Sequence, residues 1–250
     1  MTPEYLFVYR GTHGEAVRQR EESLWEPSFR ENVACARAIE KALCVHFDST
    51  GPIPPDCAGK VVEEYGFKRV GFVLASTVQD LEQVPVCGLS DESREWAHGF
   101  NLTPDNDYGH YYYVDTADVL LDQFIQQTRD AYQALGLFSR THCESGMYDA
   151  DVKGKVLVMK PDTLKERCWS RENQLWLAEG GFGCAPESSG RAIYATCLAD
   201  GEKTRWNRED FIGVLDRQYL PEWAEGKLNE ILAQKQGHKN SPALKRFEMC

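Results

Sequence analysis

The sequence of 250 residues contains no apolar run of membrane-spanning length and no N-terminal pattern of a signal peptide. We therefore expect a soluble, cytoplasmic protein. It also contains no C-x-x-C pair, although it has nine cysteines. An odd number of scattered cysteines argues against a disulfide framework and against a zinc site, so we expect reduced thiols.

Positive charge is scarce in the first part of the chain. Residues 1–138 contain 22 Asp and Glu against 11 Lys and Arg, whereas residues 139–250 contain 17 of each. Ten acidic residues and a single basic residue, Arg94, lie between Asp80 and Asp122. A surface of this composition repels phosphates. Direct nucleic-acid binding through the first half is therefore not expected.

The first half has the apolar periodicity of helices, with Gly and Pro between the segments. A short apolar run predicts a strand at residues 5–9. A helix is expected from Ser23 or Ser28 to Phe47, and another from Asp115 or Thr116 to Leu135. Further helices are predicted at 55–65, 70–81 and 90–97. The β-branched residues of 70–81 also permit a strand, but the length of this segment favours a helix.

The second half alternates short strand patterns with breakers. Runs of β-branched and aromatic residues predict strands at 155–159, 174–177, 191–196 and 203–206. Asn207 is expected to cap a helix over 208–215, and Pro221 is expected to open the last helix.

These patterns predict an α+β protein with two parts. Residues 1–138 are expected to form an acidic, mainly helical domain. Residues 139–236 are expected to form a small antiparallel-sheet α+β domain, followed by a loose tail over 237–250.

A glycine-rich connection joins two of the predicted strands. The candidate ligand-binding loop consists of Gly180, Gly181, Gly183, Cys184, Ser188 and Ser189. Consecutive backbone N–H groups in such a loop can bind an anion. The spacing matches neither the P-loop nor the dinucleotide-binding pattern, however, so a bulged connection between paired strands is the favoured interpretation.

An enzyme is the alternative to a binding protein. Cys184 in a glycine-rich loop suggests a thiol nucleophile, but the six histidines are scattered along the sequence and none has a readable partner. Arg10 and Ser76-Thr77 resemble the cofactor-binding residues of an ADP-ribosyltransferase, but the late strands lack the Glu-x-Glu motif of that family. No metal-ligand spacing is evident. We therefore predict no catalytic residue, no metal and no cofactor.

Basic residues of the second half are interleaved with four aromatic residues, namely Trp169, Trp176, Tyr194 and Trp206. On a sheet face such a mixture can stack bases and hold phosphates. Core aromatics with a charged, solvated rim explain the same pattern, and we favour this interpretation.

Several segments resemble an uncharacterised domain family found in mobile elements of Firmicutes. The resemblance rests on residues 30–32, 38–40, 55–58 and 73–78, and the helix around 122–129 fits a downstream helix of that family. Residues 174–184 look like a segment often found in proteins of the same elements. The resemblance implies no chemistry, but it implies a context, because the cargo of such elements often serves to survive host defences.

The acidic stretch is the candidate partner-binding surface. Carboxylates can occupy the phosphate sites of a nucleic-acid-binding protein, and tyrosines can anchor the contact. The surface comprises Asp91, Glu92, Glu95, Asp105, Asp107, Tyr108, Tyr111, Tyr112, Asp115 and Asp118. A solvated acidic loop is the simpler explanation of the same stretch.

From this surface we predict a protein that inhibits a host defence nuclease, as anti-CRISPR proteins do. It would cover the basic nucleic-acid site of a partner such as a CRISPR effector. The alternatives are an enzyme that uses the glycine-rich loop and a regulatory partner in element transfer. The sequence does not fix the oligomeric state.

Overall fold

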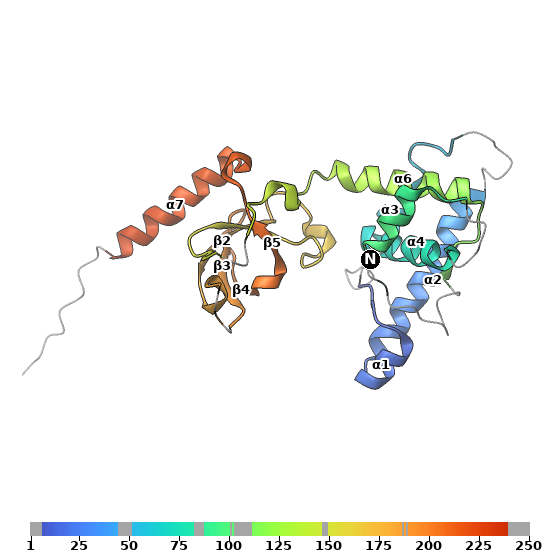
Figure 1. The fold of residues 1–250 in the computed structure, drawn as a ribbon, viewed down its shortest axis with the longest axis horizontal. Coiled ribbons are helices and arrows are strands. Elements are labelled where there is room, and N and C mark those ends of the chain that lie inside the picture. Colours follow the sequence, from blue (N-terminus) through green and yellow to red (C-terminus); the bar gives the residue numbers. More distant parts are fainter. Residues whose placement is uncertain are drawn as a thin grey trace, which may run out of the picture. The chain divides into compact units, whose positions relative to one another are not determined.

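The computed structural model describes residues 7–44, 52–82, 88–100, 102, 112–146, 150–186, 188 and 190–239. The chain forms two compact units that divide between Leu135 and Gly136 (Figure 1). The first unit is helical, and the second is built on an antiparallel sheet. This arrangement confirms the predicted α+β fold.

The described residues of the first unit form six helices. They are α1 (His13–Gln19), α2 (Glu22–Cys44), α3 (Cys57–Tyr65), α4 (Phe67–Leu81), α5 (Asp91–His98) and α6 (Asp118–Ala134). Thr12 and Glu15 form a capping box at the start of α1. Ser90 caps α5, as predicted, because its hydroxyl accepts a hydrogen bond from the Ser93 N–H over 3.2 Å.

Helix α4 lies at the centre of the first unit. Its residues from Arg69 to Ala75 are all buried, and it packs against α2, α3, α5 and α6. Packing on nearly every side outweighs the low helix propensity of its β-branched residues. The prediction of a helix over 70–81 is therefore confirmed.

A buried arginine joins three parts of the first unit. Arg69 is 1% exposed, and its guanidinium donates hydrogen bonds to the carbonyl oxygens of Ser28 (2.9 Å) and Phe7 (2.6 Å). It also donates to the side-chain oxygen of Asn32. The Tyr9 N–H donates to the Ser28 hydroxyl over 2.9 Å. These contacts hold the segment before α1 against α2 and α4.

The second unit contains a five-stranded sheet. Its strands are β1 (Val156–Met159), β2 (Leu175–Gly180), β3 (Ala192–Cys197), β4 (Lys203–Asn207) and β5 (Phe211–Val214). Their order is β4-β3-β2-β1-β5, and every neighbouring pair is antiparallel. The four predicted strands are confirmed, and β5 is an additional strand.

The connection from β4 to β5 requires the sheet to curve strongly. A 3-10 turn over Arg208–Asp210 joins these two outermost strands. In a flat sheet, four strand spacings would separate them by about 19 Å. The chain from Asn207 to Phe211 can reach at most about 14 Å. The sheet is therefore curled toward a partly closed barrel.

The two faces of this sheet carry separate apolar clusters. One face holds Trp176 and Trp206, whose rings meet edge to face at a centroid distance of 5.4 Å. The other face is covered by Phe138 and by helix α7 (Glu222–Lys239), which follows Pro221 as predicted. All four residues of β1 are buried because both faces are covered.

Two predicted elements are wrong. Residues 208–215 form a 3-10 turn and β5 rather than a helix, because β5 pairs with the distant strand β1. Residues 7–10, the end of the expected first strand and the segment that follows it, form no strand. Their backbone is hydrogen-bonded to Arg69 and Ser28 instead.

Two predicted helix caps are also wrong. Ser23 and Ser28, the two predicted cap positions, both lie inside α2, which begins at Glu22. The N-cap of α6 is Ala117, which makes no side-chain hydrogen bond, rather than Asp115 or Thr116.

We expect Arg69→Met to lower the free energy of unfolding by about 3 kcal/mol, because it removes the buried donor to three oxygen atoms. Urea denaturation followed by circular dichroism measures this change. Arg37→Met is the control, since Arg37 is exposed on α2 and pairs only at the surface with Glu40; it should change stability by less than about 0.5 kcal/mol. Equal effects of the two substitutions would contradict the role assigned to Arg69.

Candidate functional site

Three acids of the predicted partner-binding surface lie on helix α5. Asp91, Glu92 and Glu95 are all exposed, whereas Ser93 and Ala97 of the same helix are buried. The spacings from Glu95 to Asp91 and to Glu92 are four and three residues, which place the three carboxylates on one side of the helix. No hydrogen bond or ion pair involves these carboxylates among the described residues.

Other acids of the same stretch have structural roles. The Asp122 carboxylate accepts hydrogen bonds from the hydroxyls of Ser90 (2.7 Å) and Ser93 (2.6 Å), so it ties the start of α5 to α6. The Asp118 carboxylate accepts from the Gly88 N–H over 2.6 Å. Asp118 is one of the predicted partner-binding residues, whereas Asp122 is not. Asp118 is already partnered within the protein.

Two further predicted residues of this surface, Tyr112 and Asp115, lie in different environments. Tyr112 is 9% exposed and packs its ring against Phe29 and Phe72 in the core. Asp115 is exposed, and its backbone N–H donates to Glu40 over 2.9 Å. Four further predicted residues lie outside the described part of the chain, namely Asp105, Asp107, Tyr108 and Tyr111.

The glycines of the candidate ligand-binding loop are required by close packing. Gly181 has a φ of +106°, and a Cβ at this position would overlap the carbonyl oxygen of Ala192. A Cβ on Gly183 would overlap the carbonyl oxygen of Arg191. By contrast, a Cβ on Gly180 would meet no atom within 4 Å. The loop therefore packs its backbone directly against the start of β3.

Three amide groups of this connection donate hydrogen bonds within it. The Cys184 N–H donates to the Gly181 carbonyl, and the Ala185 N–H donates to the Phe182 carbonyl. The Gly190 N–H donates to the Ser188 hydroxyl over 3.2 Å. These three groups are unavailable to a bound anion, and the close packing of Gly181 and Gly183 on the start of β3 favours a strand connection. Ser189 lies outside the described residues.

Cys184 has the environment of a structural thiol. It is 4% exposed and belongs to the apolar cluster inside the curved sheet. Burial, reinforced by the nearby Asp151, raises the pKa of the Cys184 thiol. A thiol nucleophile requires a lowered pKa. Beside it, the buried Arg208 donates to the carbonyl oxygens of Gly183 and Ala150, which closes this end of the sheet.

The structure does not assemble the residues that resemble an ADP-ribosyltransferase site. Ser76 and Thr77 lie inside α4, and their hydroxyls donate to the carbonyls of Phe72 and Val73. Thr77 also accepts from the Val114 N–H. Their side chains are therefore occupied by the helix and by the core.

The tryptophans of the second half are core residues. Trp176 and Trp206 pack inside the curved sheet, and the Trp169 indole N–H donates to the Pro161 carbonyl over 2.8 Å. Of the four aromatics interleaved with basic residues, only Tyr194 is exposed. In the described ranges, no cluster of His, Cys, Asp and Glu has the arrangement of a metal site, and no helix is long and apolar enough to span a membrane.

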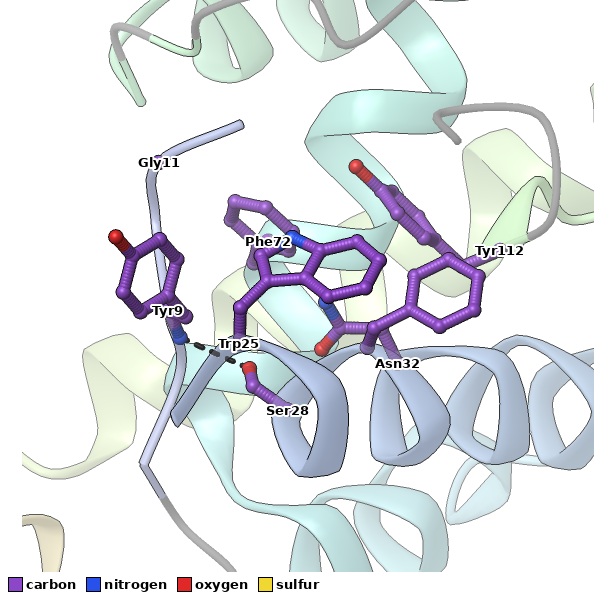
Figure 2. Close-up of a pocket in the computed structure, with 8 residues that line it drawn as sticks. Tyr9, Gly11, Trp25, Ser28, Asn32, Phe72 and Tyr112 are labelled. Atoms are coloured by element: carbon purple, nitrogen blue, oxygen red, sulfur yellow. Dashed lines mark hydrogen bonds between the residues drawn. The ribbon is translucent and has the colours of Figure 1, made fainter. Parts of the chain in front are cut away.

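The helical unit contains a hollow that was not predicted from the sequence. Aromatic rings of Tyr9, Trp25, Phe72 and Tyr112 surround it, and Asn32 lies at its base (Figure 2). Gly11, Ser28 and Phe29 complete the lining. Trp25 and Phe29 are stacked one turn apart on α2, at a centroid distance of 4.9 Å. The spacing of Trp25, Phe29 and Asn32 on one helix face is the signal that a search of the sequence can use.

A family model described as "Protein of unknown function (DUF3849)" matches residues 8–133, which are 126 of the 250 residues. No curated protein matches, and no solved structure matches. The matched residues fall within the helical unit, which contains both α5 and the aromatic hollow.

We expect Gly183→Ala to lower the free energy of unfolding by about 3 kcal/mol, because the added methyl group overlaps the backbone of Arg191. Gly180→Ala is the matched control in the same connection and should change stability by less than about 0.5 kcal/mol. Urea denaturation of the two variants distinguishes a packed connection from an open ligand-binding loop, in which both substitutions would be tolerated.

We expect Cys184 to react with iodoacetamide more slowly than the exposed Cys44 at pH 8. The raised pKa of Cys184 leaves less of it as thiolate, and its labelling should increase as the pH rises toward that pKa. Mass spectrometry of the alkylated peptides measures both rates, and unfolding in urea should make them similar. Faster labelling of Cys184 in the native protein would restore the thiol-enzyme hypothesis.

Proposed function

The chain belongs to the family described as a protein of unknown function (DUF3849), and we propose that it is a mobile-element protein that inhibits a host defence nuclease. In this proposal the exposed acids of α5 cover a basic nucleic-acid site, and CRISPR effectors are the partner class because they have long basic channels. The observation that carries the proposal is the row of three carboxylates, Asp91, Glu92 and Glu95, on one side of a short helix, which have no partner in the part of the chain that the structure describes.

The row is presented by a firmly anchored helix. Ser90 caps α5, and Asp122 of α6 binds both Ser90 and Ser93 at the first turn. On its other side, α5 packs on α4, where Gly71 allows the ring of Phe100, just after α5, to approach closely. A preorganised row of charges loses little conformational entropy on binding.

The proposed surface is smaller than the sequence predicts. Of the predicted residues that the structure describes, Asp118 and Tyr112 have structural contacts. Asp91, Glu92, Glu95 and Asp115 are exposed, and we assign the partner contact to these four. Carboxylates at such positions attract a basic groove and accelerate association, and the effect weakens with added salt.

A non-catalytic role agrees with the environment of the candidate catalytic groups. Three backbone N–H groups of the glycine-rich loop donate within that loop, and Cys184 is a buried thiol with a raised pKa. An inhibitor that acts by occlusion requires none of these groups.

We expect the quadruple variant with Asp91, Glu92, Glu95 and Asp115 replaced by Lys to lose binding to a purified Cas9-type effector. A control variant reverses four exposed acids elsewhere, namely Glu63, Asp130, Glu172 and Glu230, so that both variants change the net charge equally. Surface plasmon resonance at several salt concentrations measures the affinities, and circular dichroism verifies that each variant folds. The wild-type affinity should fall steeply with salt.

Two results would contradict the proposal. If the wild-type protein binds no basic nuclease at low salt, inhibition by occlusion is wrong. If the quadruple variant and the control variant lose affinity equally, the overall charge of the protein explains the binding, and a specific surface on α5 does not.

A further inference from the structure

The hairpin of β3 and β4 carries an exposed tyrosine next to an arginine on its outer face. Ile193 of β3 and Trp206 of β4 pack in the apolar cluster inside the curved sheet. Because successive residues of a strand alternate between the two faces, their neighbours Tyr194 and Arg205 point outward. Tyr194 is 56% exposed, and the two residues are directly opposite each other in the strand register. The phenol ring and the guanidinium are therefore neighbours on one open surface.

A second exposed ring lies beside this surface. Phe182 is 77% exposed, more than any other large apolar side chain of the described ranges. A Cβ on Gly181, the preceding residue, would lie 3.2 Å from the ring of Tyr194, and a Cβ on Gly190 would overlap the Cβ of Phe182. The glycine-rich connection thus places Phe182 beside the start of β3. Two neighbouring exposed rings form an apolar surface that a partner can cover.

The outward-facing side chains of the hairpin include two cations and no acid. They are Ala192, Tyr194 and Thr196 on β3 and Lys203, Arg205 and Asn207 on β4. Neither the Lys203 ammonium nor the Arg205 guanidinium has an ion pair or hydrogen bond in the part of the chain that the structure describes. Both cations are therefore available to an anionic partner.

Three acids near the hairpin are engaged within the protein. Glu179 and Glu202 accept hydrogen bonds from threonine hydroxyls over 2.7 and 2.8 Å. Glu209 pairs with Arg191 at 3.0 Å. The excess negative charge of the chain lies in residues 1–138, whereas residues 139–250 contain equal numbers of acidic and basic residues. The charge of the sheet unit therefore does not oppose the approach of an anion to this hairpin.

Helix α7 leaves the hairpin uncovered. The apolar cluster beneath α7 takes its strand residues from β1, β2 and β5, and it includes none of β3 or β4. Strand β4 is also at one end of the strand order, so in the described sheet it pairs with β3 alone (Figure 1). The surface is therefore open above its side chains and along the free edge of β4.

These properties restrict the chemistry of the partner. A free phosphate would use the cations but not the rings, and an apolar peptide would use the rings but not the cations. A nucleotide has both parts, because its base stacks on an aromatic ring and its phosphate pairs with a cation. Lys203 and Arg205 are two residues apart on β4, about 7 Å, which suits successive phosphates of an extended strand. Bases inside a duplex are already stacked and paired, so the exposed rings favour a single strand.

We propose that the outer face of the β3–β4 hairpin binds single-stranded nucleic acid. Bases stack on Tyr194 and Phe182, and phosphates pair with Arg205 and Lys203. Stacking of this kind tolerates any sequence, because every base has a flat aromatic face. The inference goes beyond the proposed inhibition and does not depend on it, since α5 belongs to the other unit.

The experiment follows the fluorescence anisotropy of a fluorescein-labelled thymidine dodecamer during titration with the full chain at low salt. A uridine dodecamer distinguishes RNA from DNA as the preferred strand, and a DNA duplex of the same length is the control ligand. We expect saturable binding of at least one single strand, with higher affinity than for the duplex. Absence of binding to both single strands, or equal binding of the duplex, would overturn the proposal.

Tyr194→Ala should weaken binding at least about fivefold, because it removes one stacked base. Tyr194→Phe keeps the ring and should bind as tightly as the wild-type protein. Tyr219→Ala is the matched control, since Tyr219 is 42% exposed in a 3-10 turn of the same unit; it should leave the affinity unchanged. Unchanged affinity in both Tyr194→Ala and Phe182→Ala, or an equal loss in Tyr219→Ala, would show that the rings do not stack on bases and would overturn the proposal.

Arg205→Gln tests the phosphate contact. It should weaken binding and reduce the slope of log affinity against log salt concentration by about 0.7, the value for one phosphate of a single strand. Arg217→Gln removes the same charge from a side chain that is 90% exposed in the same unit, and it should leave the slope unchanged. Equal slopes in the two variants would mean that overall charge attracts the strand, which contradicts the contact assigned to Arg205. Circular dichroism verifies that each variant folds.

Discussion

The buried guanidinium of Arg69 is the constraint on which the helical unit depends. A charge in the middle of a helical core is costly to bury unless hydrogen bonds compensate for its lost hydration. Here the two terminal nitrogens of Arg69 donate to Ser28 and Asn32 of α2 and to Phe7 before α1. These contacts fix where the N-terminal segment crosses α2. The contact with Asn32 also fixes the orientation of the Asn32 amide, which lines the aromatic hollow.

In the sheet unit, a neutral and a charged side chain at the ends of the strands form hydrogen bonds with the backbone. The buried side chain of Gln174 accepts from the Phe138 N–H and donates to the carbonyls of Phe138 and Met159. Arg208 connects the 3-10 turn after β4 to the glycine-rich connection. Because these polar side chains and the glycines close the curved sheet, the features that suggested a ligand loop in the sequence are explained by packing.

The sequence predicts elements well where local periodicity determines them and poorly where distant contacts do. The helix over 70–81 follows from its spacing of apolar residues, and the cap at Ser90 follows from its hydroxyl. Strand β5 was missed because its four residues form a strand only through pairing with β1, more than fifty positions earlier. The hollow was missed because Tyr9, Asn32, Phe72 and Tyr112 are brought together by the tertiary fold.

The acidic stretch shows why composition alone overestimates a binding surface. Asp118 and Asp122 belong to it, yet both accept hydrogen bonds that position α5 on α6. An acid that satisfies a backbone or hydroxyl donor is stabilising the fold, and reversing its charge would test folding rather than recognition. Only the acids that no internal donor requires are available to a partner. The acids of this reduced surface lie in the helical unit, in the part of the chain that the family model matches.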